Sequence, residues 1–204
     1  MEHAVSDASV NSAIRGLHEF ITAPAARKNL LLASWTPRRN TEIRMSRSYN
    51  PTYDDILLRA KQARDYFLLI GPPGTGKTSM ALRYIVEEEL ADGGTHPSIL
   101  LMAYTNRAVD EICSMLEDAG ADYLRLGNRY SCDKRYRHRL IENMVERNPR
   151  LDAIRAKMAS TRIVTCTTSM LMSKPYFFRI KRFSLAVIDE ASQILEPNII
   201  GLLA

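Results

Sequence analysis

The feature that most constrains this chain is the stretch from Gly71 to Thr78, which reads GPPGTGKT. It fits G-x-x-x-x-G-K-[ST], a loop whose backbone N–H groups surround phosphate when a strand precedes it and a helix follows. The apolar residues 66–70 predict the strand, and residues 77–90 predict the helix. We therefore expect a nucleotide site here. Its predicted phosphate-binding residues are Gly71, Pro72, Pro73, Gly74, Thr75, Gly76, Lys77 and Thr78.

The rest of the chain alternates between short apolar runs and helical segments. Strands are predicted at 98–103, 162–166 and 185–189, with a weaker one at 123–126. Helices are predicted at 6–21, 54–63, 108–118 and over most of 133–158. In the first of these, Val10, Ile14, Leu17 and Ile21 share one stripe. Short apolar strands separated by helices favour an α/β fold with a parallel sheet covered on both faces.

A second chemical element lies at 185–193, which reads LAVIDEASQ. Four apolar residues place Asp189 and Glu190 at the C-terminal tip of a buried strand, the edge where ligands bind in α/β sheets. We expect Asp189 and the Thr78 hydroxyl to hold Mg²⁺ and Glu190 to activate the attacking water. A purely structural alternative is that the two carboxylates cap the following helix. Because no guanine-reading N-K-x-D occurs, ATP is the preferred nucleotide, and GTP stays open.

Composition excludes several other classes of protein. The three cysteines, at 113, 132 and 166, form no C-x-x-C pair, so we expect buried free thiols rather than a metal site. The longest apolar runs are far shorter than a bilayer span, and the N-terminus does not resemble a secretory signal. We expect no membrane association and an intracellular, cytoplasmic location. The net charge of +5 is compatible with nucleic acid but does not by itself indicate it.

Four motifs in order carry a resemblance to a known family. GPPGTGKT is followed by ILLMAYTNRAVDEI (99–112), RIVTCTTSML (162–171) and LAVIDEASQ. Together they resemble motifs I, Ia, Ic and II of superfamily 1 helicases. The match is closest to the 5′-to-3′ branch with the nonsense-mediated-decay helicase and the Okazaki-fragment nuclease–helicase. The resemblance covers roughly residues 65–193. It implies a P-loop NTPase with a RecA-like sheet that hydrolyses ATP with Mg²⁺, and it adds Gln193 to the nucleotide-binding residues.

The resemblance also implies contacts to a single nucleic-acid strand, DNA or RNA. Small polar side chains that follow two predicted strands would hold the phosphate backbone without reading bases. The residues concerned are Thr105, Asn106, Thr165, Thr167 and Thr168. The alternative is that these threonines are ordinary strand formers and helix caps.

A basic segment lies between motifs Ia and Ic. Residues 123–162 hold 11 Lys/Arg against 4 Asp/Glu, a net charge of +7. Tyr130 and Tyr136 are interleaved and would be able to stack on bases. We expect residues 122–158 to form a basic helical insertion that stands off the sheet and contacts nucleic acid. The alternative is a solvated helix face with pairs such as Glu146–Arg150.

The chain departs from the family pattern in two respects. The family's adenine-reading glutamine has no clear counterpart upstream of the loop, since residues 50–54 read NPTYD and Gln62 stands too close. The second RecA-like domain, which closes the ATP cleft in the family, has no counterpart in the sequence. We therefore expect residues 1–50 to be an accessory segment and residues 51–204 the first motor domain, with a second RecA-like domain as its partner.

The predicted function is the ATP-binding motor domain of an ATP-dependent DNA or RNA helicase, weakly active or inactive without its partner domain. Lys77, Thr78, Asp189 and Glu190 are its predicted catalytic set. The main alternative is a P-loop ATPase that acts as a switch or assembly factor without nucleic acid. Salt-dependent binding of a single-stranded oligonucleotide distinguishes the two.

Overall fold

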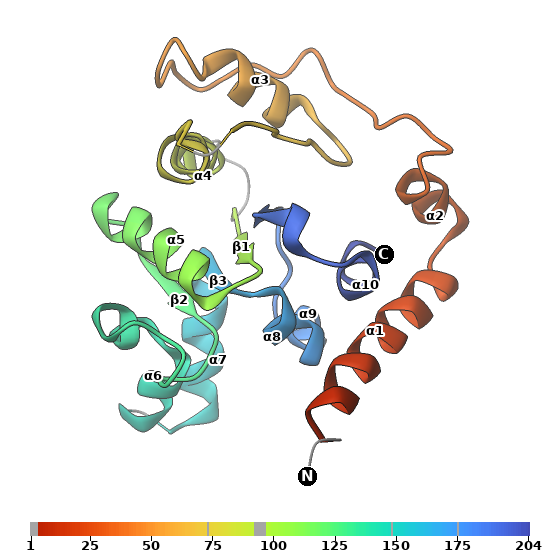
Figure 1. Ribbon diagram of the computed structural model, residues 1–204. Coiled ribbons are helices and arrows are strands. Elements are labelled where there is room, and N and C mark those ends of the chain that lie inside the picture. Colours follow the sequence, from red (N-terminus) through yellow and green to blue (C-terminus); the bar gives the residue numbers. More distant parts are fainter. Residues whose placement is uncertain (1–3, 73, 92–96, 148, 175) are drawn as a thin grey trace.

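The core of the molecule is a parallel sheet. A computed structural model describes residues 4–72, 74–91, 97–147, 149–174 and 176–204. The strands are β1 (Ile99–Ala103), β2 (Tyr123–Arg125), β3 (Ile163–Thr167) and β4 (Leu185–Asp189), in the order β2-β3-β1-β4. Ile99 of β1 lies beside Ile163 and Leu185 of its two neighbours, all parallel. The predicted α/β class with a parallel sheet is confirmed (Figure 1).

Helices cover both faces of this sheet because successive residues of a strand point to opposite sides. Leu101 packs with α4 (Leu82–Ala91) and α5 (Asn106–Asp118). Leu100 packs with the other group, α7 (Leu151–Ser160), α8 (Thr168–Ser173) and α9 (Phe177–Ile180). Figure 1 shows α5 on one side of the strands and α8 and α9 on the other. Burial of each of these leucine side chains stabilises the fold by about 1.5–3 kcal/mol.

The segment 122–158 does not stand off the sheet, so that expectation is wrong. β2 is an edge strand of the sheet, paired with β3. The predicted long helix is broken into the 3₁₀ segment η2 (Lys134–Arg139), α6 (Ile141–Arg147) and α7. Pro149 separates the last two because proline cannot continue a helix. Both helices place apolar side chains in the core beneath the sheet, which holds the segment against it.

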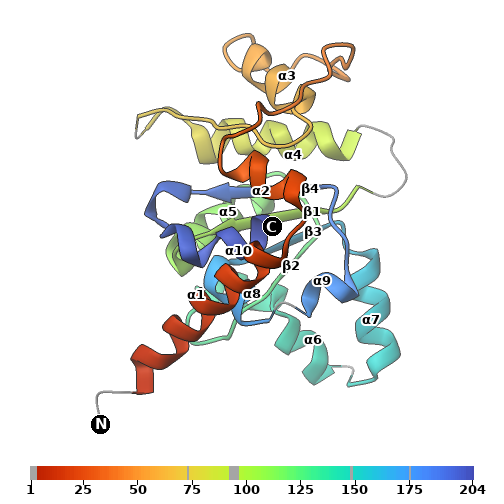
Figure 2. The ribbon, with the colours of Figure 1, turned by 90° about the vertical axis from the view of Figure 1, so that its right-hand side faces the viewer.

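The strand predicted at 66–70 is also absent. These residues have no strand assignment, and Leu68 and Ile70 are 72% and 90% exposed. A strand requires a neighbour for its backbone groups. Within the described residues, β4 pairs only with β1, and no ladder reaches 66–70. In Figure 2 the strands run from β4 at the top to β2 at the bottom, and α4 lies above β4.

The N-terminal residues form α1 (Ala4–Thr22), α2 (Ala25–Leu31) and, after a long connection, α3 (Asp54–Gln62). α1 crosses the short helix α10 (Ile200–Leu203) so closely that a Cβ atom on Gly201 would lie 2.5 Å from the Gly16 Cα (Figure 2). The stripe predicted on α1 faces outward, with its four members at least 42% exposed. These are Val10, Ile14, Leu17 and Ile21.

Two carboxylates hold the connection before α3 against the rest of the fold. Glu88 of α4 is buried and accepts hydrogen bonds from the Ser46 backbone and hydroxyl and from Lys61 of α3. Asp65 accepts from the Arg38 guanidinium at 2.7 Å. Residues 1–50 thus contact the predicted ATPase domain, and the boundary at residue 50 stays a prediction.

Two further predictions from the composition concern the cysteines and membrane-spanning segments. Cys113, Cys132 and Cys166 are free and buried. Burial raises the pKa of Cys113 to about 11 and that of Cys166 to about 12, because desolvation disfavours the thiolate. These thiols are therefore inert. Among the helices of the described ranges, none is long and apolar enough to cross a bilayer.

Candidate nucleotide site

The phosphate loop turns sharply at two glycines. Gly74 and Gly76 have φ angles of 77° and 75°, a conformation that other residues rarely adopt. At Gly76 a Cβ atom would also lie 2.5 Å from the Tyr53 hydroxyl oxygen. Within the loop, the Thr75 hydroxyl donates to the Pro72 carbonyl at 2.8 Å. Pro73, a predicted phosphate-binding residue, lies outside the described residues.

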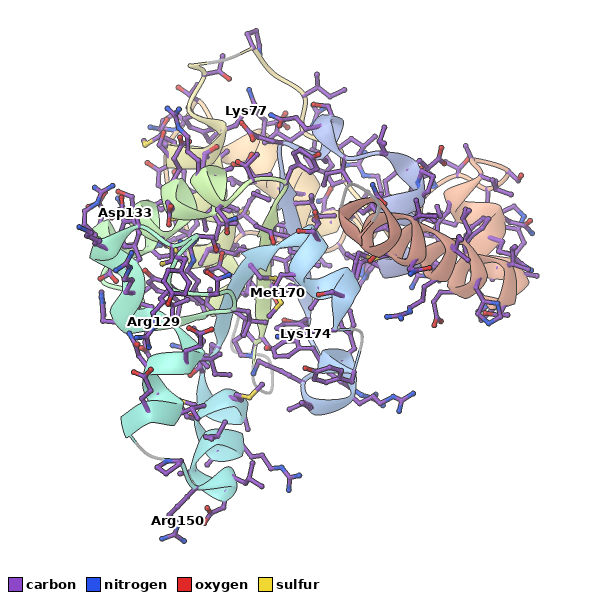
Figure 3. The ribbon with its side chains drawn as sticks, turned by 60° about the horizontal axis from the view of Figure 1, so that its bottom comes forward. Lys77, Arg129, Asp133, Arg150, Met170 and Lys174 are labelled. Carbon is purple, nitrogen blue, oxygen red and sulfur yellow. The ribbon has the colours of Figure 1, made fainter. Side chains whose placement is uncertain are left out.

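Lys77 begins the helix that follows the loop. Its first turn, Lys77–Ala81, has π-helical geometry, in which the Ala81 N–H donates to the Gly76 carbonyl at 3.0 Å. The Lys77 ammonium folds back over the loop and donates to the carbonyls of Gly71 and Pro72 (labelled in Figure 3). An ammonium group carries three donors and no acceptor, so the two carbonyls accept its hydrogen bonds here. The phosphate oxygens of a bound nucleotide would take the place of these carbonyls.

The loop and the acidic strand end meet in one hydrogen bond. The Thr78 hydroxyl donates to Oδ2 of Asp189 at 2.7 Å, across 111 residues of sequence. Asp189 is the last residue of β4, and its other oxygen accepts from the Glu190 backbone N–H at 3.0 Å. A hydroxyl and a carboxylate at this spacing are hard oxygen donors of the kind Mg²⁺ prefers. The two residues predicted to hold the metal therefore lie together.

Glu190 and Gln193 follow at the sheet edge. Glu190 has a φ of 54°, a left-handed conformation that costs about 1–3 kcal/mol in a residue other than glycine. It turns the chain from β4 into the 3₁₀ segment η3 (Ala191–Gln193). Both side chains are exposed and make no hydrogen bond or ion pair with described residues, which leaves them accessible to a ligand.

The predicted nucleic-acid residues divide into two groups. Thr105 caps α5 by accepting from the Ala108 N–H at 3.1 Å, and Asn106 beside it is exposed. Thr165 is completely buried in β3, so the expectation that it contacts nucleic acid is wrong. Thr167 and Thr168 are 8% and 3% exposed, and Thr167 caps α8. The strand-former and helix-cap alternative describes these three, and the cap on α5 means that it also describes the Thr105 hydroxyl.

The basic segment is partly neutralised by acidic residues that precede it. Arg125 is buried and paired with Asp110 of α5. Arg139 pairs with Glu117 of α5 at 2.9 Å. Asp122, which also precedes the segment, pairs with Arg139 and Lys157. Three further pairs, Arg129–Glu146, Arg135–Asp133 and Arg150–Asp152, lie within the segment and are already included in its net charge. The net charge of residues 123–162 therefore overstates the charge that a nucleic acid meets.

The two tyrosines of that segment differ. Tyr136 is 4% exposed and belongs to the core, so the expectation that it stacks on bases is wrong. Tyr130 is 91% exposed. The charge count from the sequence covered only the segment itself, whereas the additional carboxylates Asp110, Glu117 and Asp122 come from α5 and from the turn before β2.

Two residues upstream of the loop were not among the predicted site residues. The Tyr53 hydroxyl donates to the Thr75 carbonyl at 2.9 Å, so the residue just before α3 supports the phosphate loop directly. Gln62 is buried, with its carboxamide accepting from Arg39 and donating to the Ile43 carbonyl. Its carboxamide is therefore occupied by hydrogen bonds within the fold and is not available to an adenine. No sequence pattern marked the tyrosine.

A phosphate loop joined to an acidic strand end defines the class of P-loop nucleotide-binding proteins. The family model described as an AAA domain matches residues 48–159. The chain is 33% identical over 155 residues to the DNA replication ATP-dependent helicase/nuclease JHS1 of Arabidopsis thaliana, covering 76% of this chain and 11% of that protein. It is 31% identical over 157 residues to helicase/nuclease DNA2 of Xenopus laevis, covering 76% and 14%. For DNA2 of Homo sapiens the identity is 33% over 145 residues, covering 68% and 13%.

The chain belongs to the AAA-domain family and, within it, to the superfamily 1 helicase motor domains of the branch that includes these helicase/nucleases. It spans about a seventh or less of the length of these three relatives.

Proposed function

We propose that the chain is an ATP-binding and ATP-hydrolysing motor domain that acts on single-stranded DNA. The hydrogen bond between Thr78 and Asp189 is the observation that carries this proposal, because it joins the phosphate loop to the acidic strand end. The family membership supports ATP as the nucleotide. The names of the relatives, DNA replication helicase/nucleases, support DNA as the strand.

In the proposed reaction the loop N–H groups bind the triphosphate and Lys77 exchanges the loop carbonyls for phosphate oxygens. Thr78 and Asp189 would hold Mg²⁺, which neutralises negative charge on the phosphates. The Glu190 carboxylate orients the attacking water and accepts its proton. Gln193 lies three residues further along the same edge and contacts the nucleotide.

The nucleotide assignment is tested by Lys77→Ala. Loss of the ammonium should weaken ATP binding at least tenfold, or about 1.4 kcal/mol, measured by titration with a fluorescent ATP analogue. Lys134→Ala is the matched control, since this exposed lysine lies on η2 far along the chain from the loop. Equal affinity of Lys77→Ala and the parent would refute the site.

For the strand contacts, we propose Thr105 and Asn106 at the C-terminal end of β1, beside Tyr104, which is 47% exposed. Fluorescence anisotropy of labelled DNA and RNA 20-mers across a salt series measures the contribution of phosphate contacts. We expect binding that weakens with salt and favours DNA. Binding of neither oligonucleotide at low salt would favour the alternative of an ATPase switch.

We further propose that hydrolysis is completed by a second RecA-like domain. Glu190 and Gln193 are exposed at the sheet edge, where such a partner would close over the nucleotide. Steady-state turnover by this chain should therefore be well below that of a chain that also contains a second motor domain. Equal turnover by the two would contradict this part of the proposal.

A further inference from the structure

A second part of the chain carries concentrated positive charge. From Ala153 to Ile188, 36 residues contain no Asp or Glu but seven Lys or Arg. The stretch begins inside α7 and ends inside β4, so it extends well beyond the predicted basic segment. The seven are Arg155, Lys157, Arg162, Lys174, Arg179, Lys181 and Arg182.

These charges differ from the earlier basic residues in their pairing. Lys157 forms an ion pair with Asp122 at 2.9 Å. Among the described residues, no carboxylate lies within ion-pair distance of the other six. Lys174, Arg179 and Arg182 are also exposed, so their charge is available to a ligand.

Aromatic and apolar side chains accompany the three exposed charges around α9. Tyr176, Phe178 and Ile180 are 53%, 39% and 49% exposed. We name Lys174, Tyr176, Phe178, Arg179, Ile180 and Arg182 the α9 surface. This local combination of unpaired cations and exposed rings fits a chain that has both negative charge and flat bases.

Two other residues of the segment hold the α9 surface in place. Phe177 is 5% exposed and stacks on Phe183 with ring centroids 6.0 Å apart. The Lys181 ammonium is buried and donates to the Ala159 carbonyl of α7 at 3.3 Å. The backbone is therefore anchored, and a ligand does not bear the full entropic cost of ordering it.

The position of the α9 surface relates it to the proposed strand contacts. Its first residue, Lys174, directly follows α8, which starts at the C-terminal end of β3. Six helical residues span about 9 Å. Figure 3 shows Lys174 beside Met170 and well away from Lys77 of the phosphate loop. The surface ends at the other edge of the sheet, because Ser184, two residues after Arg182, donates its backbone N–H to the Ser98 carbonyl just before β1. A strand bound at Thr105 and Asn106 would therefore reach the α9 surface by running over α8.

We propose that the α9 surface is a second contact area for single-stranded nucleic acid. Lys174, Arg179 and Arg182 hold successive phosphates, and Tyr176 and Phe178 stack on bases. The inference rests on the proposed action on a nucleic-acid strand and adds a second contact area beyond α8, toward the opposite edge of the sheet from Thr105 and Asn106. The combination of cations and aromatic rings favours a nucleic acid over an acidic peptide as the ligand, because an acidic peptide has negative charge but no bases to stack on the rings.

The charge contribution is tested with the double substitution Arg179→Glu/Arg182→Glu. Anisotropy titrations of a labelled dT20 oligonucleotide across a salt series should show at least tenfold weaker binding. The slope of log K against log salt should fall in magnitude by about 1.4, the value for two lost phosphate contacts. Arg15→Glu/Arg27→Glu, at exposed positions on α1 and α2, is the control with the same charge change.

The stacking contribution is tested with Tyr176→Ala, which should weaken dT20 binding about five- to a hundredfold and leave the salt slope unchanged. ATP binding and the melting temperature of each variant report whether the fold is intact. If the α9 variants bind like the control while Thr105→Ala/Asn106→Ala binds weakly, the α9 surface is refuted and the strand contacts stand. If the parent itself binds no dT20 at low salt, the proposed function fails instead.

Discussion

The two halves of the nucleotide site are built very differently. The acidic half ends β4, which pairs along its length with β1 in the parallel sheet. The loop half follows residues 66–70, which join no strand and expose Leu68 and Ile70. Its supports are single hydrogen bonds, from Tyr53 to Thr75 and from Thr78 to Asp189. The sheet thus fixes the carboxylate proposed to hold the metal, whereas the phosphate loop depends on a few polar contacts.

The largest effect expected from this difference is on stability. Leu101→Ala removes a fully buried side chain from β1 and should lower the free energy of unfolding by about 2–5 kcal/mol. Leu68→Ala, the same change at a 72% exposed position, should stay within about 0.5 kcal/mol. Urea unfolding of both variants measures this. A large loss at Leu68 would show that 66–70 packs as a strand after all.

A smaller effect is expected from the support of the loop. Tyr53→Phe keeps the ring but removes the hydrogen bond to the Thr75 carbonyl, worth about 0.5–1.5 kcal/mol. Hydrogen exchange of the backbone N–H groups at 74–78 should accelerate, with unchanged exchange in β1. Tyr130→Phe, at an exposed hydroxyl, is the control. Unchanged exchange in the loop would show that Tyr53 does not support it.

The smallest expected effect is a change in stability at acid pH. The Arg38 guanidinium lowers the pKa of Asp65 from 3.8 to about 2. Because the folded pKa is the lower one, this carboxylate stabilises the fold above about pH 4, and the contribution is lost as pH falls toward 2. The melting-temperature difference between the parent and Asp65→Asn should therefore shrink from pH 5 to pH 2.5. A constant difference would contradict the assignment.

How much the sequence could predict depends on whether a feature was local. GPPGTGKT and LAVIDEASQ predicted the loop and the acidic strand end that the structure brings together, since each motif carries its own turn and chemistry. Residues 66–70 have the composition of a strand, but a strand also needs a neighbour, which composition does not reveal. Arg125 and Arg139 looked available because their partners, Asp110 and Glu117, lie outside the segment counted. Thr165 shows the same limit, because burial in β3 depends on β1 and β2.

The hydrogen bond between Thr78 and Asp189 also has a kinetic meaning. It connects residues 111 positions apart, and Asp189 reaches it only when β4 has docked on β1. Contacts of such long sequence separation form late, because closing a large loop costs entropy before the contact compensates for it. A chain emerging from the ribosome therefore gains the proposed metal-binding pair only after nearly all of these residues have been made. Nucleotide affinity would then mark the end of folding.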